Sequence, residues 1–205
     1  GGFAQYAGLT EFFVQKTAQE RSEERREVQE NTLGVLCVKE LLLAADLGTT
    51  TLAFVCADAW GEILASYGCE NPQRKTAADV VGRIDAALHG QGESLTNEIR
   101  EALVKGFLFV LADGQKALND RGKCTENLRV KVGIAGNTVM QHLLLGYPLE
   151  GMAKAPFKPY TMKMIKHRFF ELFSGVDGAH MVPPVLEQAE VTVFPCLSAF
   201  VGGDA

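Results

Sequence analysis

Apolar and polar residues alternate in short blocks from residue 41 onward, in a pattern typical of β-strands. The apolar runs 41–45 and 52–57 are each long enough for a buried strand, and the polar stretch Asp-Leu-Gly-Thr-Thr-Thr at 46–51 separates them. Residues 61–67 have the pattern of a third strand, after turn residues at 58–61. The sequence therefore predicts an antiparallel meander of three strands with a polar tip on its first hairpin.

The next part of the chain changes to helical spacing. Apolar residues recur at helical intervals in 76–88 and 94–119, and the second segment is long enough for one core-facing helix or two. Residues 129–134 alternate as a strand, and 138–145 are expected to form a helix that Gly146 ends. This order of elements predicts an α/β fold with a mixed sheet.

Proline punctuates residues 147–184, which predicts an irregular excursion with a short helix or strand near 169–173. A basic cluster lies within this excursion: Lys163, Lys166, His167 and Arg168. Such a cluster is either a solvated surface or a contact for an acidic partner. Residues 191–194 then have the pattern of a final apolar strand.

The chain before residue 41 differs from the rest. Residues 10–30 are rich in Glu, Arg and Gln at helical spacings, and residues 31–34 break the pattern. We expect residues 1–40 to be a charged helical extension, serving as an attachment, a linker or a docking helix. Residues 41–205 are expected to be the folded domain.

Composition narrows the class of protein. The chain has 205 residues, a formal net charge of -5 and a pI near 5.4, so no basic footprint indicates nucleic acid or an anionic membrane. It contains neither an apolar stretch of membrane-spanning length nor a signal-peptide pattern, which predicts a cytoplasmic protein. The cysteines lack the spacing of zinc or iron–sulfur ligands, and we expect them to be reduced: Cys37, Cys56, Cys69, Cys124 and Cys196.

The loop at 46–51 is the first candidate site. Gly48 permits a tight turn or the close approach of a ligand, and Asp46 places a carboxylate where a hydrated metal ion could bind. Threonines that offer hydroxyl and amide donors follow the glycine: Thr49, Thr50 and Thr51. The alternative is a plain hairpin turn, for which Asp and Gly are favoured on conformational grounds alone. The loop lacks the lysine and the trailing helix of a Walker A loop.

The turn at 136–138 is the second candidate site. Gly136, Asn137 and Thr138 join a predicted strand to a predicted helix, so backbone N–H groups at the helix start could bind phosphate or a polarised water. Asn137 could orient that water. The alternative is an ordinary strand-to-helix turn in which Asn137 is only the N-cap.

Several motifs occur in order along the chain: Asn71-Pro72-Gln73, Ala78-Asp79-Val80 with Arg83-Ile84, Ile134 to Thr138, Ala155-Pro156-Phe157 with Pro159, and Ser198 to Gly202 with Asp204. Together they resemble the ATP-binding domain of reductive activators of corrinoid proteins, in the superfamily of actin, the heat-shock chaperones and the sugar kinases. The resemblance implies an RNase-H-like lobe, with an N-terminal antiparallel meander and helices on both faces of a mixed sheet. It implies that residues 41–205 are the first lobe and that the second lobe is absent.

In that family, ATP binding and hydrolysis are linked to the transfer of a low-potential electron to the oxidised cobalt of a partner. The resemblance therefore implies ATP and Mg²⁺ as cofactors, a corrinoid protein as the partner, and an iron–sulfur cluster only outside this chain. It implies that Asp46 and Asn137 are catalytic, that Asp46 also binds the metal, and that both candidate sites contact the nucleotide. An isolated lobe is expected to bind ATP weakly and to be inactive, because half of the phosphate donors are missing.

Two other functions remain open from the sequence. One is a small-molecule kinase of the same superfamily, which would need a base carboxylate in its cleft, and the sequence offers only Asp46 and Asp204 for that role. The other is a non-catalytic interaction module that keeps the fold.

Overall fold

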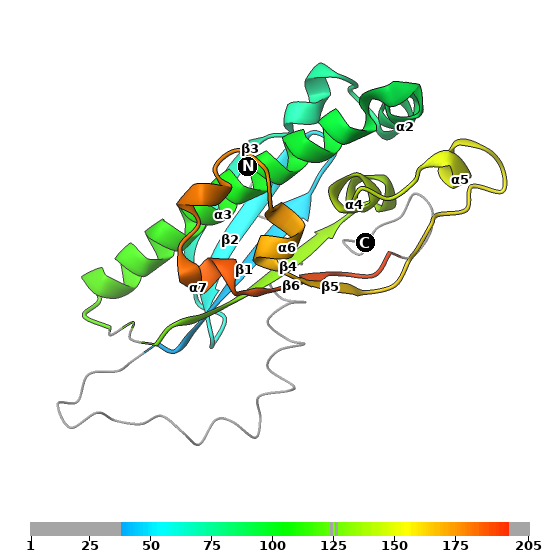
Figure 1. Ribbon diagram of the computed structural model, residues 1–205. Helices are drawn as coiled ribbons and strands as arrows, with labels where there is room; N and C mark the ends of the chain where they lie inside the picture. The colour runs from blue at the N-terminus through cyan, green and yellow to red at the C-terminus, as the bar shows by residue number, and fades with distance from the viewer. Residues whose placement is uncertain (1–37, 124, 126, 197–205) are drawn as a thin grey trace.

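A six-stranded mixed sheet forms the centre of the computed structural model, which describes residues 38–123, 125 and 127–196 (Figure 1). The strands lie in the order β3-β2-β1-β4-β6-β5. Their bounds are β1 (Glu40–Leu47), β2 (Thr51–Asp58), β3 (Ile63–Glu70), β4 (Arg129–Gly136), β5 (Ile165–Arg168) and β6 (Glu190–Val193). The predicted meander is confirmed, because β2 pairs antiparallel with both β1 and β3. The pairs β1 with β4 and β4 with β6 are parallel.

Helical segments connect the strands. The α-helices are α2 (Val80–Ala86), α3 (Gly92–Asp120), α4 (Thr138–Leu145), α5 (Glu150–Ala153), α6 (Phe169–Phe173) and α7 (Pro184–Glu187). The 3-10 helices are η3 (Pro72–Lys75) and η5 (Ala179–Met181), and η4 (Ala87–Gln91) is a π-helical segment. The segment predicted as one helix or two is the single helix α3. The helix predicted at 76–88 begins later, because Asp79 is its N-cap and accepts a hydrogen bond from the Gly82 N–H.

The hydrophobic core lies between one face of the sheet and α3. Alternate residues of β1, such as Leu41 and Leu43, join the core cluster together with Phe54 of β2. Helix α3 adds Phe107, whose ring lies 5.5 Å from that of Phe54 in an edge-to-face arrangement. Apolar residues that alternate along the strands and apolar residues at helical spacing in α3 therefore pack together in one buried layer.

Gly106 allows α3 to lie directly against β2. A Cβ at this position would lie 2.3 Å from Cζ of the buried Phe54 ring. We expect Gly106→Ala to lower the free energy of unfolding of the chain by about 1–2 kcal/mol, because overpacking outweighs the higher helix propensity of alanine. Gly92→Ala is the matched control, since a Cβ there meets only ordinary contacts at 3.7 Å. Urea denaturation measures both, and equal stability of the two variants would contradict this packing account.

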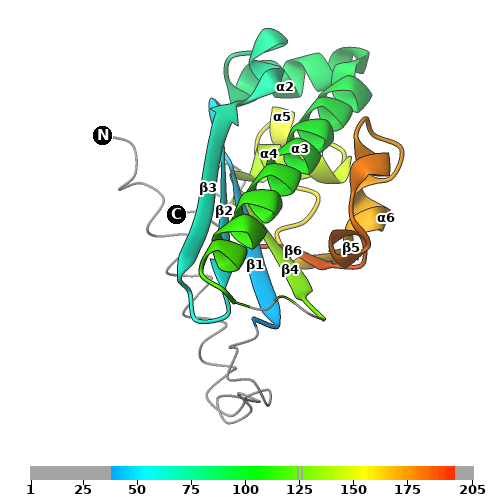
Figure 2. The same cartoon turned by 90° about the vertical axis from the view of Figure 1, so that its left-hand side faces the viewer.

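The helices that contact the sheet lie on one face of it in the described part of the chain (Figure 2). Helix α6 packs beside α3, with 6.1 Å between the ring centroids of Phe107 and Phe169. The expectation of helices on both faces is therefore wrong for these residues. The physical reason is topological: the connections from β3 to β4 and from β4 to β6 step toward the same edge of the sheet, and right-handed connections that step in one direction return over the same face.

Other expectations meet the structure in part. The excursion at 147–184 forms a helix at 169–173, where a short helix or strand was predicted, and it also contains the edge strand β5, which the sequence pattern did not reveal. Cys56 and Cys196 are buried free thiols, Cys69 is a half-buried one, and burial raises the pKa of the Cys56 thiol to about 12. Cys37, Cys124, the charged segment 1–37 and the motif at 198–204 lie outside the described residues. Within the described residues, no helix combines the length and hydropathy that crossing a membrane requires.

Candidate functional site

The two candidate sites lie next to each other at the same edge of the sheet. Strands β1 and β4 are parallel neighbours, and their last residues, Leu47 and Gly136, are paired. The chain therefore leaves both strands on the same side, as it does at the ligand sites of other parallel sheets. A hydrogen bond of 3.1 Å from Asn137 Nδ2 to Thr49 Oγ1 joins the two candidate sites. We call residues 46–51 the first loop and residues 136–138 the second turn.

Close packing fixes the glycine in each of these segments. A Cβ on Gly48 would lie 2.3 Å from the Thr51 carbonyl oxygen, and a Cβ on Gly136 would lie 2.6 Å from Leu47 Cβ. Real Cβ atoms do not come so close to other heavy atoms, so a side chain at Gly48 would distort the first loop itself, and one at Gly136 would push the second turn away from that loop. Gly48 therefore permits the tight shape of the first loop, and Gly136 permits the close approach of the second turn to it.

Asn137 connects the second turn to α4. Its Oδ1 accepts a hydrogen bond from the Met140 N–H at 3.0 Å, so it is the N-cap of the helix, as the ordinary-turn alternative predicted. Its Nδ2 donates to Thr49, so the same side chain also links helix and loop. Asn137 keeps one further N–H for another acceptor, and the positive end of α4 lies beside the first loop.

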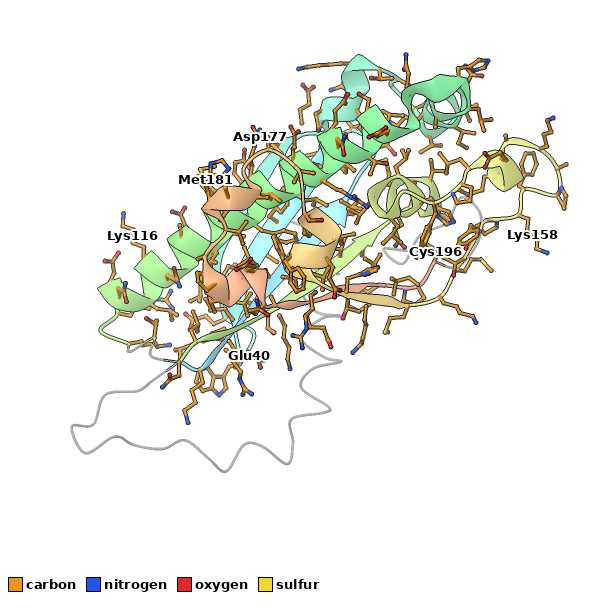
Figure 3. All side chains as sticks on the ribbon, viewed as in Figure 1. Glu40, Lys116, Lys158, Asp177, Met181 and Cys196 are labelled. Carbon is orange, nitrogen blue, oxygen red and sulfur yellow. The ribbon has the colours of Figure 1, made fainter. Side chains whose placement is uncertain are left out.

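Side chains behind the second turn hold it in place. Gln141 Nε2 donates to the Gly136 carbonyl at 3.0 Å, and Gln141 Oε1 accepts from the Cys196 thiol at the same distance. Figure 3 shows Cys196 close to α4. The carbonyl of the turn is therefore fixed from within the protein by buried partners.

Asp46 points to the face of the sheet opposite α3, because its neighbours Ala45 and Leu47 are in the core. The residue is half-buried, and its Oδ1 is shielded from solvent. No group of three or more His, Cys, Asp or Glu side chains that could hold a metal occurs in the described residues. A single carboxylate beside threonine hydroxyls nevertheless suits Mg²⁺, which commonly binds one or two carboxylates and completes its shell with water and phosphate oxygens.

A buried arginine anchors the first loop from the side of α2. Arg83 is fully buried, and its Nη2 donates to the Thr49 carbonyl at 2.6 Å. Its Nη1 and Nε donate to Gln73 Oε1 and to the Ala77 carbonyl, each at 3.2 Å. Desolvation lowers the pKa of the Arg83 guanidinium, with Asp79 and Glu98 acting in the opposite direction. Because an arginine stays protonated in proteins, a positive charge lies directly behind the loop.

Asn71 holds the neighbouring peptide group. Its Nδ2 donates to the Gly48 carbonyl at 2.8 Å, beside the bond from Arg83 to the Thr49 carbonyl. The C=O and N–H of a trans peptide point in opposite directions. The N–H groups of Thr49 and Thr50 therefore point away from Asn71 and Arg83. Successive N–H groups of this kind form an anion-binding concavity in many proteins.

The structure brings together some of the predicted residues and separates others. Asp46, Gly48 and Thr49 lie beside the second turn, whereas the side chains of Thr50 and Thr51 are exposed. Thr51 is already the first residue of β2 and pairs with Glu70 of β3. Thr138 is fully buried.

Asn71 and Arg83 were not among the site residues predicted from the sequence. The structure buries Arg83 together with Ile84 and leaves Val81 67% exposed. A signal was present, since both residues belong to the motifs that carry the family resemblance.

Comparison with known proteins identifies the family. The sequence model described as the RACo middle region matches residues 41–205. The chain belongs to this family. The predicted resemblance to reductive activators of corrinoid proteins is thereby confirmed, whereas a search of curated proteins gives no match.

A solved structure has the same fold as this RACo middle region. It is described as a reductive activator for a corrinoid, iron–sulfur protein, and it aligns with a TM-score of 0.61 at 22% identity. The alignment covers 83% of this chain and 25% of the other, so the chain spans about a quarter of that activator. At this identity the likeness shows the fold alone.

Proposed function

We propose that this RACo middle region is the first lobe of an RNase-H-like, two-lobed ATP-binding domain. The strand order supports this, since an antiparallel meander is followed by two parallel strands on the far side of β1. The arrangement of the first loop and the second turn at one sheet edge also supports it. The adenosine would then be held by chain outside the described residues.

In this proposal the first loop and the second turn bind the phosphates of ATP. Asp46 would hold the Mg²⁺, which neutralises phosphate charge when it is bound. The N–H groups of Thr49 and Thr50, the remaining N–H of Asn137 and the start of α4 would donate to phosphate oxygens. Arg83 contributes positive charge from behind and keeps the loop in shape.

The full-length protein would use this site to drive a low-potential electron onto the oxidised cobalt of a corrinoid protein. The family match and the likeness to a reductive activator for a corrinoid, iron–sulfur protein support this role. An iron–sulfur cluster would supply the electron from another part of the full-length protein. This lobe by itself would bind ATP weakly, because it holds only part of the ligand.

One observation carries the proposal. Residues 49 and 137 are 88 positions apart in sequence, and their side chains form a hydrogen bond beside a shared sheet edge. A plain hairpin turn would have no reason to meet a helix start, whereas a phosphate site needs donors from both.

The test uses the full-length protein and its corrinoid iron–sulfur partner. We expect MgATP to bind and to accelerate reduction of the oxidised cobalt. The absorption spectrum of the cobalt measures this reduction in samples with and without MgATP, and both samples contain a reductant. Phosphorylation of a small molecule without any effect on cobalt would instead indicate the kinase. Absence of any nucleotide binding would indicate the interaction module and contradict the proposal.

A further inference from the structure

A positively charged strip lies beyond α4, in residues 154–168. No acidic residue occurs between Glu150 and Glu171, although the whole chain has a formal net charge of -5. The strip contains exposed cations: Lys154, Lys158, Lys163, Lys166 and Arg168. The basic cluster noted in the sequence is the second half of this longer strip.

Large apolar side chains are exposed among these cations. They are Phe157 at 46%, Tyr160 at 66%, Met162 at 44% and Met164 at 39% exposure. Aromatic and methionine side chains are enriched at protein interfaces, and contiguous exposed apolar residues mark contact sites. Charged side chains around such residues select a partner by complementary charge.

The cations of β5 have a local explanation. Lys166 forms an ion pair with Glu190 at 2.9 Å, and Arg168 donates to the Gln188 carbonyl at the same distance. Because β5 is the edge strand, charged side chains there also prevent pairing with other sheets. These two residues therefore carry no argument for a partner.

The lysines of the loop have no such explanation. Among the described residues, no ion pair involves Lys154, Lys158 or Lys163. Figure 3 shows Lys158 on the outermost part of this loop. Charges of one sign that stay uncompensated within their own protein favour a surface of the opposite sign.

The protein holds this loop in a defined shape. The Lys158 N–H donates to the Gly151 carbonyl at 2.7 Å, and the ring of Tyr160 lies 5.0 Å from that of Tyr147. The Thr161 N–H also donates to Nε2 of the buried His142 in α4. A loop shaped in advance loses less conformational entropy when a partner binds.

We propose that the strip docks an acidic surface of the corrinoid protein, an inference that rests on the proposed function. Its attachment to α4 places it next to the helix whose N-cap contacts the first loop. A protein surface fits better than nucleic acid, because the basic footprint is one loop in an acidic chain.

The test compares two double charge reversals in the full-length protein. Lys158→Glu with Lys163→Glu alters the strip, and Lys39→Glu with Lys116→Glu makes the same change in net charge elsewhere. We expect the strip variant to bind the corrinoid iron–sulfur protein about tenfold more weakly, with a smaller dependence on salt, and the control to bind like the wild type. Isothermal titration calorimetry at low and high salt measures this.

MgATP affinity, measured in the same proteins, separates the two proposals. Unchanged MgATP binding in the strip variant, together with weaker partner binding, supports the docking surface. Equal partner binding by the strip variant and the wild type overturns the docking surface and leaves the proposed function standing. The docking surface is also overturned if the strip variant loses binding only to an RNA oligonucleotide or to phosphatidylserine vesicles, and not to the corrinoid protein. A wild type that binds neither MgATP nor the corrinoid protein overturns both proposals.

Discussion

Asp46→Asn is expected to lower the MgATP affinity of the full-length protein by roughly 10- to 100-fold, the usual effect of losing one charged contact. Asp46 is the acidic side chain of the first loop, at the end of β1 beside the paired second turn. Asparagine keeps the size of the side chain and removes the negative charge that a magnesium ion requires. Calorimetric titration with MgATP measures the change.

The control for Asp46→Asn is Asp113→Asn, which removes the same charge from an exposed position on α3. We expect Asp113→Asn to bind MgATP like the wild type. The far-ultraviolet circular dichroism of both variants should match that of the wild type. MgATP binding within twofold of wild type in Asp46→Asn would contradict the assignment of the metal to this carboxylate.

Arg83→Met is expected to destabilise the chain by about 2 kcal/mol and to lower MgATP affinity roughly tenfold. Methionine fills a similar volume but leaves the buried acceptors at Thr49, Gln73 and Ala77 without their donor. The variant no longer buries a charged guanidinium, and the desolvation free energy that is saved offsets part of that cost. The first loop then loses both its anchor and the positive charge behind it.

Arg100→Met provides the comparison for Arg83. Arg100 is half-buried, and its Nε donates to the Leu144 carbonyl at 2.9 Å, away from the first loop. We expect a loss of about 1 kcal/mol with unchanged MgATP affinity. Urea denaturation and nucleotide titration together distinguish the two arginines. If both variants bind MgATP equally well, Arg83 serves stability alone.

Arg83 also indicates how this site differs from a Walker A loop. A Walker A loop carries its lysine within the phosphate-binding loop and continues into a helix. Here the first loop runs straight into β2. The cationic side chain that donates to the loop, Arg83, comes from a separate helix more than thirty residues later. The helix start is likewise supplied by another segment, at Asn137. In the proposed site, three separate segments contribute what one segment contributes in a Walker A loop.

The local pattern of the sequence determined most of the elements. The alternation in 41–67 predicted the meander, and Gly146 correctly predicted the end of α4, where it adopts a left-handed conformation with φ of 68°. Both signals depend on nearby residues alone. The edge strand β5 escaped prediction because its four residues, Ile-Lys-His-Arg, carry too few apolar positions to show a period.

The positions of Asp46, Gly48 and Asn137 in turns after strands could be predicted from neighbouring residues, since turn chemistry is local. The meeting of these turns could not be predicted in this way, because it depends on parallel pairing of β1 with β4, which joins segments far apart in the chain. Burial of Arg83 was decided in the same way, since its acceptors come from the first loop, η3 and the turn before α2. No local period encodes such partners, so a charged residue on a short helix gives no sign of its burial until the whole chain has folded around it.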